Sequence, residues 1–169
     1  MRENQAFPRG CSICQQGAKM VLFITGRCLR TCWYCPLSTQ RKGRDDIYAN
    51  EKKVNTPHEA LSVARTMDAL GSGVTGGEPL LVLERVLSFC RELKGELGED
   101  HHIHLYTGRP PQRDELRALS GFVDEVRMHP PHEEWQQIGE SAFLDSVTMA
   151  REMGFSAGFE VPALPGIEN

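Results

Sequence analysis

Short apolar runs alternate along the chain with amphipathic segments. The run Lys19–Thr25 (KMVLFIT) is almost continuously apolar and is closed by Gly26, which predicts a strand buried on both faces. Further short runs predict strands near residues 73–75, 102–107, 123–128 and 155–161. Strands that alternate with helices favour a parallel sheet built from right-handed βαβ units.

The segments between these strands carry helix signals. Thr56 is a natural N-cap, Pro57 suits the first turn, and Glu59 completes a capping box with Thr56. An apolar stripe of period 3.6 follows, and Gly71 is expected to end this helix. Further helices are predicted over residues 83–97, 113–119 and 141–153. Residues 27–55 remain as a long polar loop, and long loops in compact domains are usually functional.

Five strands and four helical crossovers predict an α/β fold, a partial (β/α) barrel with parallel strands. A closed barrel needs more units, and the chain stops soon after the fifth strand. We therefore expect an open barrel that is incomplete at its C-terminus. Residues 19–169 are expected to form this core, preceded by an N-terminal extension over residues 1–18.

Composition says more about the compartment and the class of partner than about the function. The 169 residues are 40% hydrophobic and 25% charged, with a net charge of −4, so nothing favours nucleic acid or an anionic membrane. Residues 1–10 lack the apolar core of a secretion signal, and the longest apolar run is far too short to cross a bilayer. We expect a cytoplasmic protein without a membrane partner. Six cysteines in a reducing compartment indicate metal or redox chemistry.

Cys28, Cys32 and Cys35 stand in a C-x3-C-x2-C spacing. Thiolates are preferred ligands of iron–sulfur clusters, and with no fourth cysteine nearby one iron would stay open to another ligand. The spacing also fits one face of a helix, but Gly26 and Pro36 bracket the segment and leave little room for one. A structural zinc site is the other alternative, although such sites normally take four ligands.

The turn Gly76-Gly77-Glu78-Pro79 follows the second predicted strand. Its two glycines let a ligand approach the backbone, and their carbonyls and the Glu78 carboxylate can accept hydrogen bonds from an ammonium group. A tight turn of purely structural meaning is the alternative. Residues 71–76 also match G-x-G-x-x-G, but they end a helix and run through a strand, so we reject a dinucleotide site.

Together the triplet and the turn resemble the signature of the radical S-adenosylmethionine superfamily. The resemblance implies a 4Fe–4S cluster on the three cysteines and S-adenosylmethionine as cofactor, cleaved reductively to a 5′-deoxyadenosyl radical that abstracts hydrogen from an unknown substrate. By the same resemblance Tyr34 would lie near the adenine, the turn at 76–78 would hold the methionine amino group, and His129 would contact the ribose. The chain is also similar to uncharacterised prokaryotic proteins related to glycyl-radical activating enzymes.

Other candidate residues are less specific. Cys11 and Cys14 form a C-x2-C pair that could hold a zinc ion, join an auxiliary cluster, act as a redox dithiol, or remain as free structural thiols. Cys90 lies in the apolar stripe of its helix and is predicted to be core. The histidines at 101, 102 and 104 begin a strand, so a packing or surface role away from the chemistry is expected.

Two functions compete at this stage. The first is an enzyme that receives electrons from reduced ferredoxin or flavodoxin and acts on a small molecule, a protein or RNA. The second is a non-catalytic iron–sulfur or zinc protein that serves electron transfer or structure. The glycine turn favours the enzyme, because an electron carrier needs no methionine-binding turn.

Overall fold

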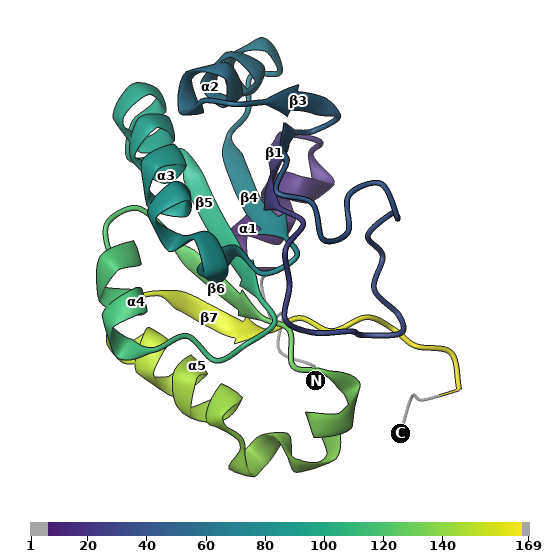
Figure 1. Cartoon of the computed structure of the whole chain (residues 1–169). Helices are drawn as coiled ribbons and strands as arrows, with labels where there is room; N and C mark the ends of the chain where they lie inside the picture. Colours follow the sequence, from purple (N-terminus) through teal and green to yellow (C-terminus); the bar gives the residue numbers. More distant parts are fainter. Residues whose placement is uncertain (1–6, 167–169) are drawn as a thin grey trace.

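One seven-stranded sheet organises the chain. The computed structural model describes residues 7–166. The strand order is β3-β2-β1-β4-β5-β6-β7, and the two outermost strands leave the sheet open (Figure 1). Five strands run parallel, at the positions predicted from the apolar runs: β1 (Lys19–Thr25), β4 (Gly71–Gly76), β5 (His102–Thr107), β6 (Glu125–Met128) and β7 (Ser156–Phe159). The prediction of an open, partial β/α barrel is confirmed.

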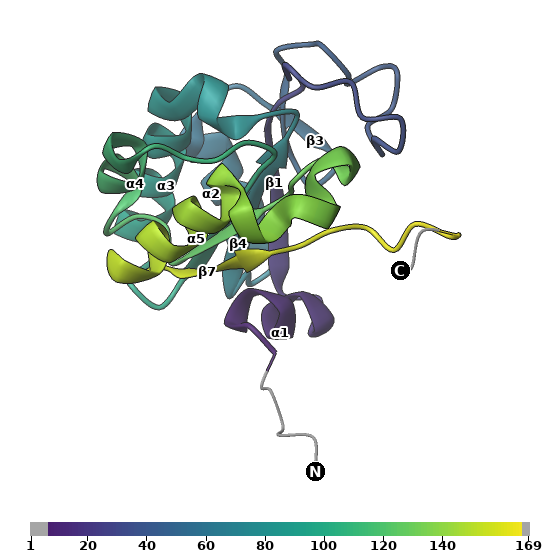
Figure 2. The ribbon, with the colours of Figure 1, turned by 90° about the horizontal axis from the view of Figure 1, so that it is seen from below.

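Four helices connect the parallel strands and gather on one face of the sheet (Figures 1 and 2). Because the strands follow one another in chain order, every crossover passes over that same face, which is the winding of a barrel wall. A doubly wound sheet would place helices on both faces. The helices are α2 (Pro57–Thr66), α3 (Leu83–Leu97), α4 (Arg113–Leu119) and α5 (Ala142–Glu152).

The core lies between the sheet and these helices. Alternate residues of each strand supply it: Ile103 and Leu105 of β5 are fully buried there, as is Leu22 of β1. Burying such a side chain contributes roughly 1.5–3 kcal/mol, so this layer drives folding. Cys90 of α3 belongs to the same core, as predicted.

The predicted loop over residues 27–55 contains an unpredicted hairpin. β2 (Ile47–Ala49) pairs antiparallel with β1, and β3 (Lys52–Val54) extends the sheet beyond it. Asn50 turns the chain with a positive φ of 53°, and its side-chain oxygen accepts a hydrogen bond from Val21 N at 2.9 Å. Each strand has only three residues, too few to show a clear alternation in the sequence.

Gly71 does not end the helix that begins after Thr56, contrary to the prediction. The capping box of Thr56 and Glu59 is present at the start of α2, but the helix ends at Thr66 and Asp68 takes the left-handed conformation. Gly71 instead opens β4, where a Cβ atom would lie 2.5 Å from the carbonyl oxygen of His102. The glycine therefore allows two strands to approach closely.

Two 3-10 segments complete the connections near the strand ends. η1 (Pro79–Val82) leads from the glycine turn into α3, and η2 (His132–Glu140) lies between β6 and α5. Within residues 7–166, no helix is both long and apolar enough to cross a membrane.

An unpredicted short helix, α1 (Arg9–Gln15), packs against the face of the sheet opposite the other helices (Figure 2). It carries Cys11 and Cys14, and its Gly10 N donates a hydrogen bond to Glu125 at 3.3 Å. A Cβ atom on Gly10 would lie 2.3 Å from Nδ1 of the His104 ring. α1 therefore docks by close backbone approach to the sheet.

Beneath α1 the sheet carries a buried polar cluster. Lys19 Nζ lies 3.2 Å from His104 Nε2, and Glu125 accepts hydrogen bonds from His102 at 3.2 Å and Arg127 at 2.5 Å. Burial raises the pKa of Glu125, but these hydrogen bonds outweigh it and leave the pKa below its usual value. Burial and the neighbouring Lys19 lower the pKa of His104. These histidines pack at the beginning of β5, the packing role predicted for them.

We predict that Gly10→Ala loosens α1. The added methyl group must displace the buried His104 ring or the helix, and such overpacking typically costs about 1–3 kcal/mol. Hydrogen exchange should rise in residues 9–15. Gly95→Ala is the control, because nothing lies within 4 Å of a Cβ atom there and alanine favours a helix. Unchanged exchange over α1 in Gly10→Ala would refute this account of its docking.

Candidate functional site

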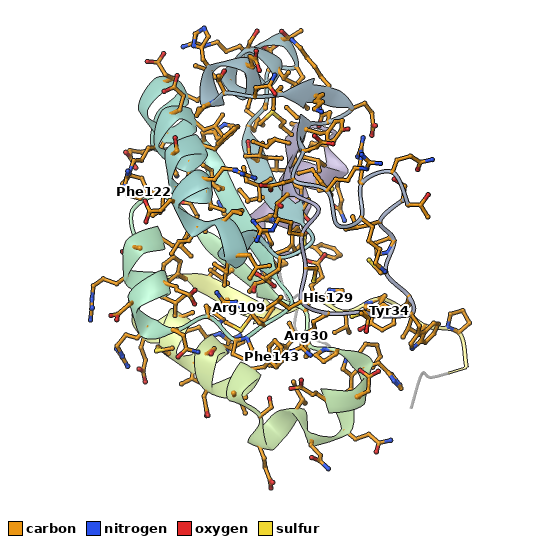
Figure 3. The ribbon with its side chains drawn as sticks, viewed as in Figure 1. Arg30, Tyr34, Arg109, Phe122, His129 and Phe143 are labelled. Carbon is orange, nitrogen blue, oxygen red and sulfur yellow. The ribbon has the colours of Figure 1, made fainter. Side chains whose placement is uncertain are left out.

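A cavity of about 300 Å³ opens where the parallel strands end. Such ends are where barrels place their chemistry. The cysteine loop, the glycine turn and the residues after β5 and β6 supply its walls, and Figure 3 shows the labelled Tyr34 and His129 on the same side of the molecule. All three cysteines of the triplet and both glycines of the turn line this one cavity.

The cysteine triplet lies on an irregular loop. Residues 26–46 contain no helix, and none of the three cysteines is buried, so they are not a core stripe on one helix face. Cys28 is exposed, while Cys32 and Cys35 are partly buried. Although the residue is exposed, partial desolvation of its thiol raises the pKa of Cys28. A hydrogen bond from Arg30 N opposes that rise, and the negative charges of Glu78 and the neighbouring thiols add to it.

The donor set suits an iron–sulfur cluster. Three soft thiols share one cavity wall, and a compact cluster needs such ligands on a loop that can wrap around it. In the described chain, residues 7–166, no three His, Cys, Asp or Glu side chains are arranged to hold a metal ion, so neither the triplet nor the Cys11–Cys14 pair forms such a group. The thiolates of a four-iron cluster bind different irons and need not meet at a single point.

Backbone hydrogen bonds join the glycine turn to the base of the cysteine loop. Gly77 N donates to Thr25 O, and Glu78 N donates to Arg27 O, both at 2.7 Å. A Cβ atom at Gly76 or Gly77 would lie 2.2 Å from one of these two acceptor oxygens. The two motifs are therefore parts of one backbone structure, which only glycine permits.

Glu78 is buried and anchors the neighbouring strand end. Its carboxylate accepts hydrogen bonds from Leu80 N at 3.1 Å, Thr107 Oγ1 at 2.9 Å and Gly108 N at 2.8 Å. Burial raises the pKa of Glu78, and the hydrogen bonds and Arg109 only partly offset this. The residue predicted to bind the cofactor amino group thus also holds the ends of β4 and β5 together.

Tyr34 and His129 face the same cavity from different elements. Their ring centroids are 6.3 Å apart, and the Tyr34 hydroxyl accepts a hydrogen bond from His132 N at 3.2 Å. Burial lowers the pKa of His129, which favours a neutral ring at neutral pH. The structure brings together the two residues that the family resemblance assigns to the nucleoside, while their roles stay predictions.

Further cavity residues were missed from the sequence. Tyr106 and Glu160 line the cavity, and burial together with the nearby Glu160 carboxylate raises the pKa of Tyr106. Glu160 follows β7 and Tyr106 is near the end of β5, so attention to every strand end could have found both. Lys42 also lines the cavity; it stands in a basic stretch of the cysteine loop, a pattern that is equally typical of a solvated loop.

Asp45 anchors the far end of the cysteine loop. It accepts hydrogen bonds from Thr25 Oγ1 at 2.7 Å and from Arg85 of α3 at 2.7 and 3.0 Å. The hydrogen bonds from Arg85 and Thr25 lower the pKa of Asp45 to about 2. Arg85 Nη1 also donates to Ile24 O at 3.1 Å, so the loop is fixed to both the sheet and a helix.

Comparison with known proteins agrees with this geometry. The chain belongs to the family of 4Fe–4S single cluster domains, whose sequence profile matches residues 15–127 and so includes the triplet and the turn. The radical S-adenosylmethionine relationship predicted from these motifs is confirmed.

A relative from Methanocaldococcus jannaschii is provisionally named a glycyl-radical enzyme activating enzyme. It is 40% identical over 175 aligned positions, which cover all of this chain and 46% of the relative. The chain thus spans somewhat less than half the length of that protein. Together, the family match and this relative indicate that the chain is an iron–sulfur protein related to the radical S-adenosylmethionine superfamily.

We predict that Asp45→Asn lowers the melting temperature near neutral pH and that this deficit disappears in acid. Because the folded-state pKa is about 2, below the ordinary 3.8, the ionised carboxylate stabilises the fold above about pH 4, and the contribution is lost as the pH falls toward 2. Thermal melts of both proteins over that range measure it. Asp114→Asn, with an 87% exposed carboxylate, should show little deficit. A deficit that persists at pH 2 would contradict the assignment.

Proposed function

We propose that this chain is the cofactor-binding core of a radical S-adenosylmethionine enzyme. Cys28, Cys32 and Cys35 would hold a 4Fe–4S cluster, with S-adenosylmethionine beside it in the cavity. Together the bound cofactors supply a 5′-deoxyadenosyl radical, by one-electron reductive cleavage, for hydrogen abstraction from a substrate. The single observation that carries this proposal is the direct backbone pairing of the cysteine loop with the glycine turn on one cavity wall.

The glycine turn would receive the methionine part of the cofactor. Gly76 and Gly77 line the cavity without side chains, so a ligand can approach their backbone, whose carbonyl oxygens can accept from an ammonium group. Glu78 adds negative charge behind them and, through Thr107 and Gly108, holds the next wall in place. The turn therefore combines binding with support.

The aromatic side of the cavity would receive the nucleoside. The Tyr34 ring offers an apolar surface for adenine, and the His129 ring can donate or accept a hydrogen bond at a ribose hydroxyl when neutral. Because the Tyr34 hydroxyl accepts a hydrogen bond from His132 N, the cysteine loop is in direct contact with the segment after β6. This link would keep the nucleoside near the triplet.

The proposal also names a class of substrate, an electron donor and a compartment. The name of the relative suggests a protein substrate, in which hydrogen abstraction would fall on a backbone glycine. Reduced ferredoxin or flavodoxin would supply the electron, and the cytoplasm is the compartment we propose. We assign residues 19–169 to the enzyme core and residues 1–18 to an extension whose Cys11 and Cys14 would form a second metal site.

The central prediction is product formation. After anaerobic reconstitution with iron and sulfide, dithionite and S-adenosylmethionine should yield 5′-deoxyadenosine and methionine in equal amounts, measured by chromatography. Cys32→Ala should lose both cluster and product, whereas Cys90→Ala, which removes a buried core thiol, should retain both. A fully formed cluster that yields no 5′-deoxyadenosine would instead favour the non-catalytic iron–sulfur protein.

Glu78→Gln should separate cofactor binding from cluster assembly. The amide nitrogen cannot accept a hydrogen bond, so a buried donor such as Leu80 N loses its partner, at a cost of about 1–3 kcal/mol. We expect normal iron content and a dissociation constant for S-adenosylmethionine raised roughly tenfold, the effect of about 1.4 kcal/mol. Equilibrium dialysis measures this, with the exposed Glu84→Gln as control. Equal affinity in both variants would exclude Glu78 from cofactor binding.

A further inference from the structure

Arg30, between the first two cysteines of the triplet, is held from three directions. Its backbone N–H donates a hydrogen bond to Cys28 Sγ at 3.4 Å. Its guanidinium lies 3.5 Å from the Glu134 carboxylate and 5.8 Å from the centroid of the Phe143 ring. Figure 3 shows Arg30 and Phe143 next to each other. One residue thus joins a cluster ligand to the segment after β6.

The anchor on the far side is rigid. Phe143 at the start of α5 is fully buried, so its ring offers a fixed surface to the guanidinium. The Arg30 and Glu134 side chains are 35% and 39% exposed, and such an ion pair alone contributes little. The ring and the carboxylate together restrict the Arg30 side chain more than either would alone, and its backbone is restricted with it.

The contact with Cys28 has a consequence for redox chemistry. Reduction adds negative charge to an iron–sulfur cluster and its thiolates, so an N–H aimed at a ligand sulfur and a nearby cation both favour the reduced state. Groups that orient ligands from outside the ligand set commonly adjust the properties of a metal site in this way. Arg30 supplies the N–H from its backbone, and its cationic side chain belongs to the residues that line the same cavity as the cysteines.

We propose that Arg30 is a positioning residue that holds its N–H on the Cys28 sulfur and thereby raises the reduction potential of the cluster. Glu134 and Phe143 set the position of Arg30. The inference rests on the cluster of the proposed function, but it does not depend on cleavage of S-adenosylmethionine.

The test is a potentiometric titration of the reconstituted protein, followed by electron paramagnetic resonance without S-adenosylmethionine. Arg30→Gln should shift the potential to more negative values. Glu134→Gln keeps the Arg30 charge but releases the side chain; because it also removes a negative charge, which by itself favours the reduced state, this variant is read by hydrogen exchange and not by the sign of its potential shift. Arg44→Gln removes an exposed charge from the same loop and should leave the potential near that of the wild type.

Hydrogen exchange of the protein before reconstitution provides a second readout. Residues 28–35 should lose protection in Arg30→Gln and Glu134→Gln but not in Arg44→Gln. If Arg30→Gln assembles its cluster poorly, the potential is measured on Arg30→Lys instead. Because this variant keeps the charge, its potential should shift to more negative values by less than full removal of the charge would cause. Potentials of Arg30→Gln and Arg44→Gln that both equal the wild-type value would overturn the proposal, and so would equal shifts in the two variants.

The outcome is separable from that of the proposed function. If the wild type assembles a cluster but yields no 5′-deoxyadenosine, the enzyme proposal fails while the comparison of potentials still decides the role of Arg30. If activity is present and the potentials do not differ, only the role of Arg30 is excluded.

Discussion

The pairing of residues 25–27 with residues 76–78 is the constraint on which the site depends. Two backbone hydrogen bonds of 2.7 Å continue the contact between β1 and β4 past the end of the sheet, into the cysteine loop on one side and the glycine turn on the other. Because carbonyl oxygens occupy the space that a Cβ atom would need at Gly76 and Gly77, side chains are excluded there. The two motifs, far apart in sequence, therefore have a fixed spacing.

From this pairing, contacts pass from one strand end to the next. Glu78 holds Thr107 at the end of β5, and the carbonyl oxygen of Thr107 accepts a hydrogen bond from His129 N at 2.8 Å at the end of β6. Tyr34 of the cysteine loop contacts the segment after His129, because its hydroxyl accepts a hydrogen bond from His132 N. The cavity wall is thus a ring of short contacts, and buried hydrogen bonds of this kind are costly to leave unpaired.

Features that depend on local pattern could be predicted from the sequence, and those that depend on distant contacts could not. The apolar runs and the capping box at Thr56 located the parallel strands and α2, and the spacing of the cysteines indicated the cluster. The hairpin after residue 46 and helix α1 are short and take their stability from pairing with distant parts of the sheet. The partners of Glu78 were invisible for the same reason, because Thr107 and Gly108 become its neighbours only after folding.

His104 illustrates a different kind of dependence. Its ring nitrogens lie where Cβ atoms on Gly10 and Gly73 would come within 2.3 and 2.7 Å, so one imidazole fills the space left by glycines on two other elements. A larger residue at either glycine requires a smaller one at position 104, and that change would leave Lys19 without its partner nitrogen. Positions 10, 73 and 104 should therefore change together or not at all as sequences diverge, although they lie on a helix and two separate strands.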